Sequence, residues 1–97
     1  MKFKQDDILD GLKDIAHSLG IKIRKERGVF TEGLCKLNNE QIILINTLSP
    51  PERVINIVAI ALDSIGLDNL YIKPFLREVI DNETGKNDIF KQNNKVK

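Results

Sequence analysis

The sequence predicts an α+β fold in the order N-terminal helix, three strands, long helix and short helix. Three observations support this prediction. Apolar residues recur at a helical period near the N-terminus, apolar and charged residues then alternate at the period of a strand, and a proline-marked segment almost without charge follows the last strand. A chain of 97 residues is long enough for one hydrophobic core and too short for two. We therefore expect a single domain over residues 1–81.

The first helix is expected over residues 6–19. Asp6 and Asp7 at its start carry the charge that the helix dipole favours, and Gly20 suits the position just after its end. Its apolar residues fall on one stripe, as in a surface helix that packs on a core: Ile8, Leu9, Leu12, Ile15, Ala16 and Leu19.

Three strands are expected to follow, in a mainly antiparallel sheet. Residues 21–26 alternate between apolar and charged, which indicates a strand with one wet face. A second strand lies within residues 29–38, and Asn38-Asn39 suits a tight hairpin turn because asparagine tolerates a positive φ. The third strand, residues 41–46, has four apolar residues in succession. Such a strand is covered on both faces or pairs at its edge with another chain.

The segment Ser49-Pro50-Pro51-Glu52 predicts the start of a long buried helix. Ser49 is expected to accept a hydrogen bond from the first turn, Glu52 to reach back to the N–H of Ser49, and Pro50 to occupy the first helical position. Between residues 54 and 62 the helix carries no charge, which is typical of a helix that is buried centrally or shared with a partner.

The long helix is expected to end at Gly66, because glycine commonly follows a helix end. A short C-terminal helix then begins at Pro74 and carries the apolar residues Phe75, Leu76, Val79 and Ile80. Residues 82–97 are polar and rich in lysine and asparagine, so we expect a flexible polar tail there.

The strand that ends on asparagine leads into the proline-marked helix through Ile43, Ile45, Asn46, Leu48, Ser49, Glu52 and Arg53. This approach resembles the N-terminal half of the IrrE/ImmA-like metallopeptidases, in which it leads into a helix with a zinc-binding H-E-x-x-H motif. The resemblance covers roughly residues 6–65. It places Ile60 and Ser64 where the two histidines would stand, and Ala61 where the catalytic glutamate would stand.

None of these three residues can bind zinc, and the helix contains no histidine. The resemblance therefore implies the scaffold of that family without its peptidase activity. The chain also resembles small bacterial proteins without an assigned activity. We expect no enzyme activity, no catalytic residue, no metal ligand and no cofactor.

Composition and charge exclude other classes of function. A formal net charge of +1 gives no overall attraction to nucleic acid or to an anionic membrane. One cysteine cannot form an internal disulfide, and the N-terminal residues lack the apolar region of a signal peptide, so a cytoplasmic protein is expected. No phosphate-binding, dinucleotide-binding or serine hydrolase motif is present. His17 is expected on the solvated face of the first helix, and Cys35 as a small buried hydrophobic residue.

The first hypothesis for function is a non-catalytic protein-interaction or regulatory module, as a homodimer or bound to a partner protein. It rests on the surplus of apolar residues in the third strand and the long helix, which a chain of this size has little material to cover. The possible interface residues are Ile42, Ile43, Leu44, Ile45, Val54, Ile57, Val58 and Ala61.

Two alternatives remain open. A small ligand or anion could contact Tyr71, Lys73 and Arg77, in a pocket between the sheet and the C-terminal segment. A nucleic acid could contact the basic cluster around the first strand, although this cluster has no interleaved aromatic residue for base stacking. The cluster consists of Lys22, Arg24, Lys25 and Arg27.

Overall fold

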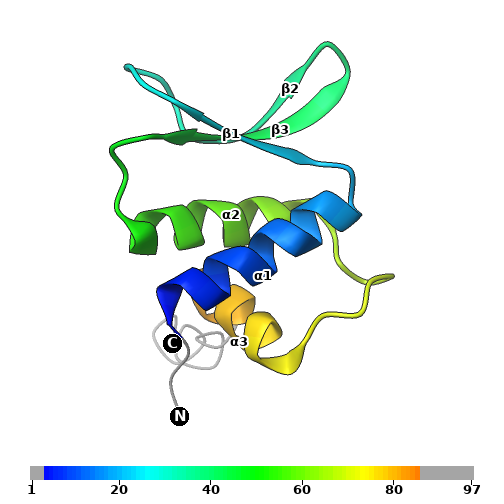
Figure 1. Cartoon of the computed structure of the whole chain (residues 1–97). Helices are drawn as coiled ribbons and strands as arrows, with labels where there is room; N and C mark the ends of the chain where they lie inside the picture. Colours follow the sequence, from blue (N-terminus) through cyan, green and yellow to red (C-terminus); the bar gives the residue numbers. More distant parts are fainter. Residues whose placement is uncertain (1–3, 86–97) are drawn as a thin grey trace, which may run out of the picture.

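The computed structural model describes residues 4–85 of the chain and has the predicted order of elements (Figure 1). Each element lies within a few residues of its predicted position. The elements are α1 (Gln5–Ser18), β1 (Lys22–Glu26), β2 (Gly33–Leu37), β3 (Glu40–Asn46), α2 (Pro51–Ile65) and α3 (Pro74–Glu83). The predicted α+β fold is confirmed. The predicted tail begins inside α3, and its part from residue 86 onward lies outside the described residues.

The sheet is mixed rather than mainly antiparallel as expected, and its strand order is β1-β3-β2. The strands alternate in direction along the chain, but β3 lies between the other two, so β1 pairs with β3 in parallel while β2 pairs with it antiparallel. The register aligns Ile23, Ile43 and Leu34 in one row across the three strands. β1 and β2 are therefore the two edge strands.

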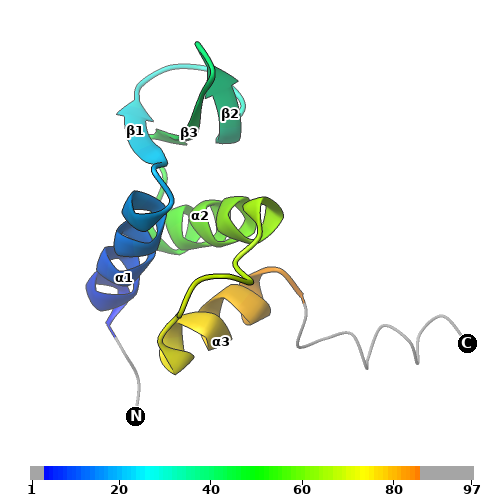
Figure 2. The same ribbon diagram turned by 90° about the vertical axis from the view of Figure 1, so that its right-hand side faces the viewer.

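All three helices lie on one side of the sheet (Figure 1). Figure 2 shows β1 above α1, and β2 and β3 above α2, with α3 beneath α2. α2 contacts both other helices as well as β2 and β3, so it is the central, buried helix that its lack of charge predicts. The most completely buried side chains lie between these layers: Leu12, Ile43, Ile45, Val58, Leu62 and Ile80.

Two turns form as the sequence predicts. Gly20 has a φ of +74°, a conformation that favours glycine after a helix. Asn38 and Asn39 have φ values of 53° and 68°, so the β2–β3 hairpin closes with two residues in the left-handed region, as a type I′ turn requires.

The predicted start of the long helix is wrong in its details. α2 begins at Pro51, Pro50 holds the cap position, and no side chain caps the first turn. Ser49 instead donates its hydroxyl proton to Oε2 of Glu32 at 2.6 Å. A charged carboxylate is a stronger acceptor than a neutral group, and it draws Ser49 away from the helix.

The prediction that Cys35 is buried is also wrong, because the Cys35 side chain is exposed. Alternation along β2 places Cys35 on the face opposite to Leu34. Leu34 packs on the core, whereas no described helix covers the face of Cys35 (Figure 1).

Among the described residues, no helix is long and apolar enough to cross a membrane.

Candidate functional site

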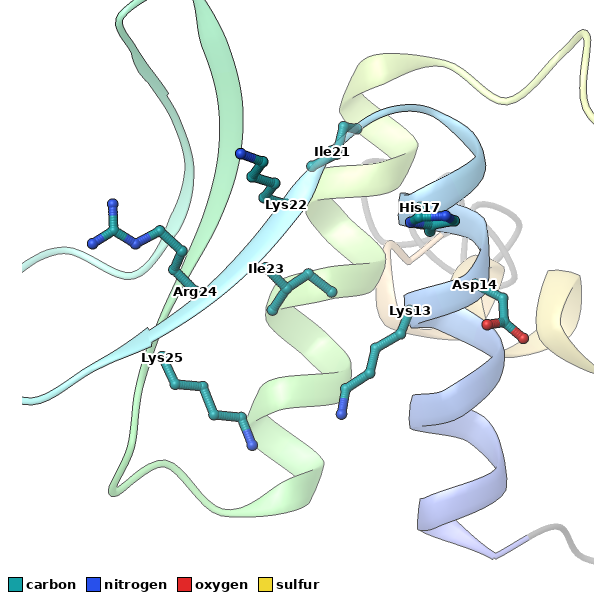
Figure 3. Close-up of a pocket in the computed structure, with 8 residues that line it drawn as sticks. All are labelled: Lys13, Asp14, His17, Ile21, Lys22, Ile23, Arg24 and Lys25. Carbon is teal, nitrogen blue, oxygen red and sulfur yellow. The ribbon is translucent and has the colours of Figure 1, made fainter.

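An open groove of about 770 Å³ lies between α1 and the edge strand β1 (Figure 3). The helical period places Lys13 and His17, four residues apart, on the side of α1 that does not enter the core. His17 is exposed, as predicted. The groove is lined by Lys13, Asp14, His17, Ile21, Lys22, Ile23, Arg24 and Lys25.

The strand period divides the side chains of β1 between two directions. Figure 3 shows Ile23 and Lys25 extending toward α1, while Lys22 and Arg24 extend from the other side of the strand. Lys13 extends from α1 into the same space as Lys25. The groove therefore receives one ammonium group from the helix and one from the strand.

The four cations around β1 differ in how far they are neutralised. Lys22 lies 3.7 Å from Glu40, and Arg24 lies 2.8 Å from Glu26, although these exposed pairs are screened by water. Lys13 and Lys25 form no ion pair with any described residue. Asp14 is the one carboxylate in the lining. The groove thus carries an excess of positive charge that an anionic ligand would neutralise.

The backbone of β1 adds hydrogen-bonding groups to this site. The carbonyl of Glu26 accepts a hydrogen bond from the N–H of Thr47, just beyond β3, at 3.0 Å. Because backbone groups alternate in direction along a strand, Lys22, Arg24 and Glu26 turn theirs toward β3. Ile23 and Lys25 then direct their N–H and C=O groups to the open edge. These groups could pair with an added strand.

A second, less charged groove of about 280 Å³ lies between β2 and α2, at the other edge of the sheet. Leu34 contributes to it from β2, and Ile57, Ile60 and Ala61 contribute from α2. Ile60 is 46% exposed although it lies on the central helix. Glu32, Asn56 and Ser64 supply the polar part of the lining.

Glu32 links this end of β2 to the start of α2. Its carboxylate accepts hydrogen bonds from the Ser49 hydroxyl at 2.6 Å, from the Asn46 N–H at 2.7 Å and from Nε of Arg53 at 2.8 Å. These three donors, together with the charge of Arg53, lower the pKa of Glu32 from its ordinary 4.5 to about 2. Glu32 therefore stays ionised at neutral pH and holds the β1–β2 loop against the β3–α2 connection.

The predicted ligand pocket has a different location from the one expected. Tyr71 and Lys73 line a cavity of about 180 Å³ against α1, together with Gly11 and Asp14, and Arg77 is not part of its lining. The sheet does not contribute, because α3 packs on α1 and α2 and contacts no described strand. The prediction of a pocket between the sheet and the C-terminal segment is wrong.

The predicted protein interface is largely covered within the chain itself. α1 and α3 pack on α2, and β1 and β2 flank β3, so most of the proposed residues have no surface to offer. Leu44 and Ile57 remain partly exposed. The buried residues of that prediction are Ile42, Ile43, Ile45, Val54, Val58 and Ala61.

The metallopeptidase resemblance places Ile60, Ala61 and Ser64 in the second half of α2. Ala61 is buried, and the Ser64 hydroxyl donates to the carbonyl of Ala61 at 2.7 Å. Among the described residues, no cluster of three or more histidine, cysteine, aspartate or glutamate side chains could hold a metal ion.

No protein-family model, curated protein or solved structure matches this chain.

The basic cluster predicted from the sequence comes together only in part. Lys22, Arg24 and Lys25 line the groove, and Arg27 does not. Sequence reasoning missed Lys13, although its spacing of four residues from His17 puts both on one helix face. It also missed Glu32, for which no local pattern gives a signal, because its three partners are 14 to 21 residues away in the sequence.

Proposed function

We propose that the protein is a non-catalytic binding module that receives an extended acidic segment of a partner protein along the free edge of β1. The observation that carries this proposal is the coincidence of an open strand edge with two lysines that form no ion pair with a described residue. Ile23 and Lys25 turn backbone groups outward, and Lys13 and Lys25 extend into the space beside them. Strand addition uses the backbone for affinity and the side chains for specificity.

The charged side chains around β1 determine which kind of peptide segment can bind. Lys22 and Arg24 lie on one face of the strand, and Lys25 and Lys13 lie on the other. An added strand alternates its side chains in the same way, so its acidic residues fit best on the face of Lys13 and Lys25, because Lys22 and Arg24 are already paired with Glu40 and Glu26. Ile21 and Ile23 supply apolar lining between the charges. An acidic segment with interspersed apolar residues fits this surface best.

Nucleic acid fits the same charges less well. No phenylalanine, tyrosine or tryptophan lines the groove, so His17 offers the one aromatic ring of the lining on which an unpaired base could stack. The chain as a whole has a formal net charge of +1, and Arg24 is already paired with Glu26. Open backbone groups of a strand favour a peptide, because a peptide can pair with them along its whole length.

An unpaired, exposed Cys35 fits a reducing compartment such as the cytoplasm.

A labelled peptide tests the proposal. The probe is a fluorescein-tagged octapeptide of alternating glutamate and valine, and fluorescence anisotropy measures its binding. We expect the variant Lys13→Glu/Lys25→Glu to bind at least about tenfold more weakly, because it reverses two charges beside the peptide. Lys4→Glu is the matched control, since Lys4 is exposed at the start of α1 and outside the groove. It should bind as the wild type does.

Two modified peptides separate strand addition from simple charge attraction. In one, only the glutamates are N-methylated, and in the other only the valines. Because alternate N–H groups of an added strand face the protein, one peptide should lose most of its affinity and the other should keep it. Equal binding of both would overturn strand addition. Binding of oligothymidylate that is lost in the double-lysine variant would instead identify a polyanion site.

A further inference from the structure

The edge of β2 is only weakly protected against pairing with another chain. Natural edge strands carry charges, prolines or bulges that discourage pairing with another chain. β2 reads Gly-Leu-Cys-Lys-Leu, and Lys36 is its only charged residue. Leu37 is 48% exposed, and Cys35 is exposed beside it. This edge therefore offers apolar side chains together with open backbone groups.

The hairpin determines which backbone groups are open. In a two-residue hairpin, the residues that flank the turn exchange both hydrogen bonds, so Leu37 turns its backbone groups toward Glu40. By alternation, Cys35 and Gly33 also face β3. Leu34 and Lys36 then direct their N–H and C=O groups outward. A strand added here would bond to these two residues.

We propose that a second copy of this chain occupies this edge, with the two β2 strands antiparallel and the two-fold axis at Cys35. In this register Leu34 lies opposite Lys36 of the second copy, and these are the residues whose backbone groups are open in both strands. Cys35 lies opposite Cys35 of the second copy as a non-hydrogen-bonded pair, in which side chains approach most closely. The pairing joins two three-stranded sheets into one sheet of six strands.

The groove beneath β2 explains why a second copy fits. Leu34 and Lys36 of an added β2 would extend toward α2, where Ile60 is partly exposed. Leu34 of the second copy supplies an apolar side chain for this groove. Lys36 of the second copy lies diagonally across from Glu32, whose ionised carboxylate is already paired with Arg53 at the rim of the groove and would gain a second cation. Both the apolar and the charged contact occur twice, because the axis is two-fold.

The helices also tolerate the pairing. α2 packs beneath β2 and β3, so the α2 helices of the two copies would lie about two strand spacings apart, or ~10 Å. Helices pack at 8 to 10 Å, so the partly exposed faces around Ile60 could close on each other. This dimer leaves both β1 edges at the outer ends of the sheet. It therefore does not depend on the proposed binding of an acidic segment.

Cross-linking through Cys35 tests the register. With copper phenanthroline as oxidant, two Cys35 thiols at the two-fold axis are within disulfide distance, and we expect rapid formation of a covalent dimer. The control is Cys35→Ala/Leu37→Cys. In the proposed register its two thiols are offset by four residues, or ~14 Å, so no disulfide should form. Equally fast cross-linking of the control would overturn the register.

The mass in solution, measured by analytical ultracentrifugation, tests the dimer without any cross-link. Lys36→Pro removes an outward N–H that β3 does not use, so it should shift dissociation to at least tenfold higher concentration. Lys36→Ala should show a smaller shift, since it loses the contact to Glu32 but keeps the N–H. Circular dichroism verifies that both variants fold. If the wild type were monomeric at several hundred micromolar, the proposal would be overturned. This edge would then be a candidate binding site for a different protein.

Discussion

The two edges of the sheet have the same backbone geometry and opposite chemistry. Each edge is a five-residue strand that lies above a groove. α1 helps to form the groove under β1, and α2 helps to form the groove under β2. The strand β1 reads Lys-Ile-Arg-Lys-Glu, whereas β2 reads Gly-Leu-Cys-Lys-Leu. Charge discourages apolar association at β1, whereas β2 carries a single charged residue, Lys36. Side chains, rather than backbone, decide what each edge can bind.

The edges also differ in how firmly they are fixed. Glu32, directly before β2, is held by Ser49, Asn46 and Arg53. At β1 the charged side chains form one link within the strand, Arg24 to Glu26, and one to β3, Lys22 to Glu40. A fixed edge suits a permanent contact, because little conformational freedom is lost on association. An edge with exposed charged side chains suits a ligand that exchanges.

The largest effect is expected from proline at neighbouring positions of β1. Arg24→Pro removes a ladder hydrogen bond and leaves a carbonyl of β3 without its donor, so we expect a loss of about 2–3 kcal/mol of stability. Lys25→Pro removes an N–H that faces the open edge and should cost about 1 kcal/mol or less. Urea denaturation measures both free energies of unfolding.

Arg24→Ala and Lys25→Ala are the matched controls, since they remove the same side chains and keep both N–H groups. Each should cost little, because exposed ion pairs contribute at most about 1 kcal/mol. Equal effects of the two prolines would contradict the direction of the backbone groups inferred from the bond between Glu26 and Thr47. The assignment of an open edge at β1 would then be lost.

A smaller effect is expected from Gly11→Ala in α1, the helix beneath β1. An added Cβ would lie 2.6 Å from Cδ1 of Leu76, a buried side chain of α3. Overpacking costs about 1–3 kcal/mol, while alanine gains about 1 kcal/mol in helix propensity. We expect a net loss of about 1 kcal/mol, measured by thermal denaturation. In a Leu76→Ala background the same substitution should stabilise, because the clash is absent.

The secondary structure could be predicted from the sequence because its signals are local. The spacing of Leu12, Ile15 and Ala16 defines one face of α1, and Asn38-Asn39 is sufficient for the hairpin. The pairing of β1 with β3 could not be predicted in this way. It depends on which strands become neighbours, and β3 lies between two strands that precede it in the chain.

The candidate site was predicted only where its residues are close in sequence. Lys22, Arg24 and Lys25 lie within one strand, and a composition argument finds them. Lys13 joins them only because α1 packs beside β1, which is a tertiary contact. The burial of Cys35 was predicted wrongly for a related reason. The sequence of a strand does not show which of its two faces the helices cover.

The pH dependence of stability sharpens the contrast in how the edges are fixed. The pKa of Glu32 is lowered from 4.5 to about 2 in the folded chain, so its contribution is present above pH 4.5 and is lost as the pH falls toward 2. We therefore expect the stability difference between wild type and Glu32→Gln to shrink across this interval. Urea denaturation at a series of pH values measures this difference.

Glu26→Gln is the comparison at the other edge, since Glu26 is partly exposed and Arg24 is its one salt-bridge partner among the described residues. At neutral pH it should cost less stability than Glu32→Gln, because an exposed ion pair contributes at most about 1 kcal/mol. If Glu32→Gln gave a difference independent of pH, the three hydrogen bonds to the carboxylate would not hold in solution. The β2 edge would then be no more firmly fixed than β1.

The smallest effect is expected at Cys35, and its value lies in the contrast with the adjacent residue. Leu34 packs on the core from one face of β2, so Leu34→Ala should cost about 1–2 kcal/mol. Cys35 faces away from the helices, and Cys35→Ala should change stability by less than about 0.5 kcal/mol at concentrations where the chain is monomeric. In the native wild-type monomer, the Cys35 thiol should react with Ellman's reagent without denaturant. A protected thiol in the monomer would contradict the exposed outer face, and the proposed two-fold contact at Cys35 would lose its geometric basis.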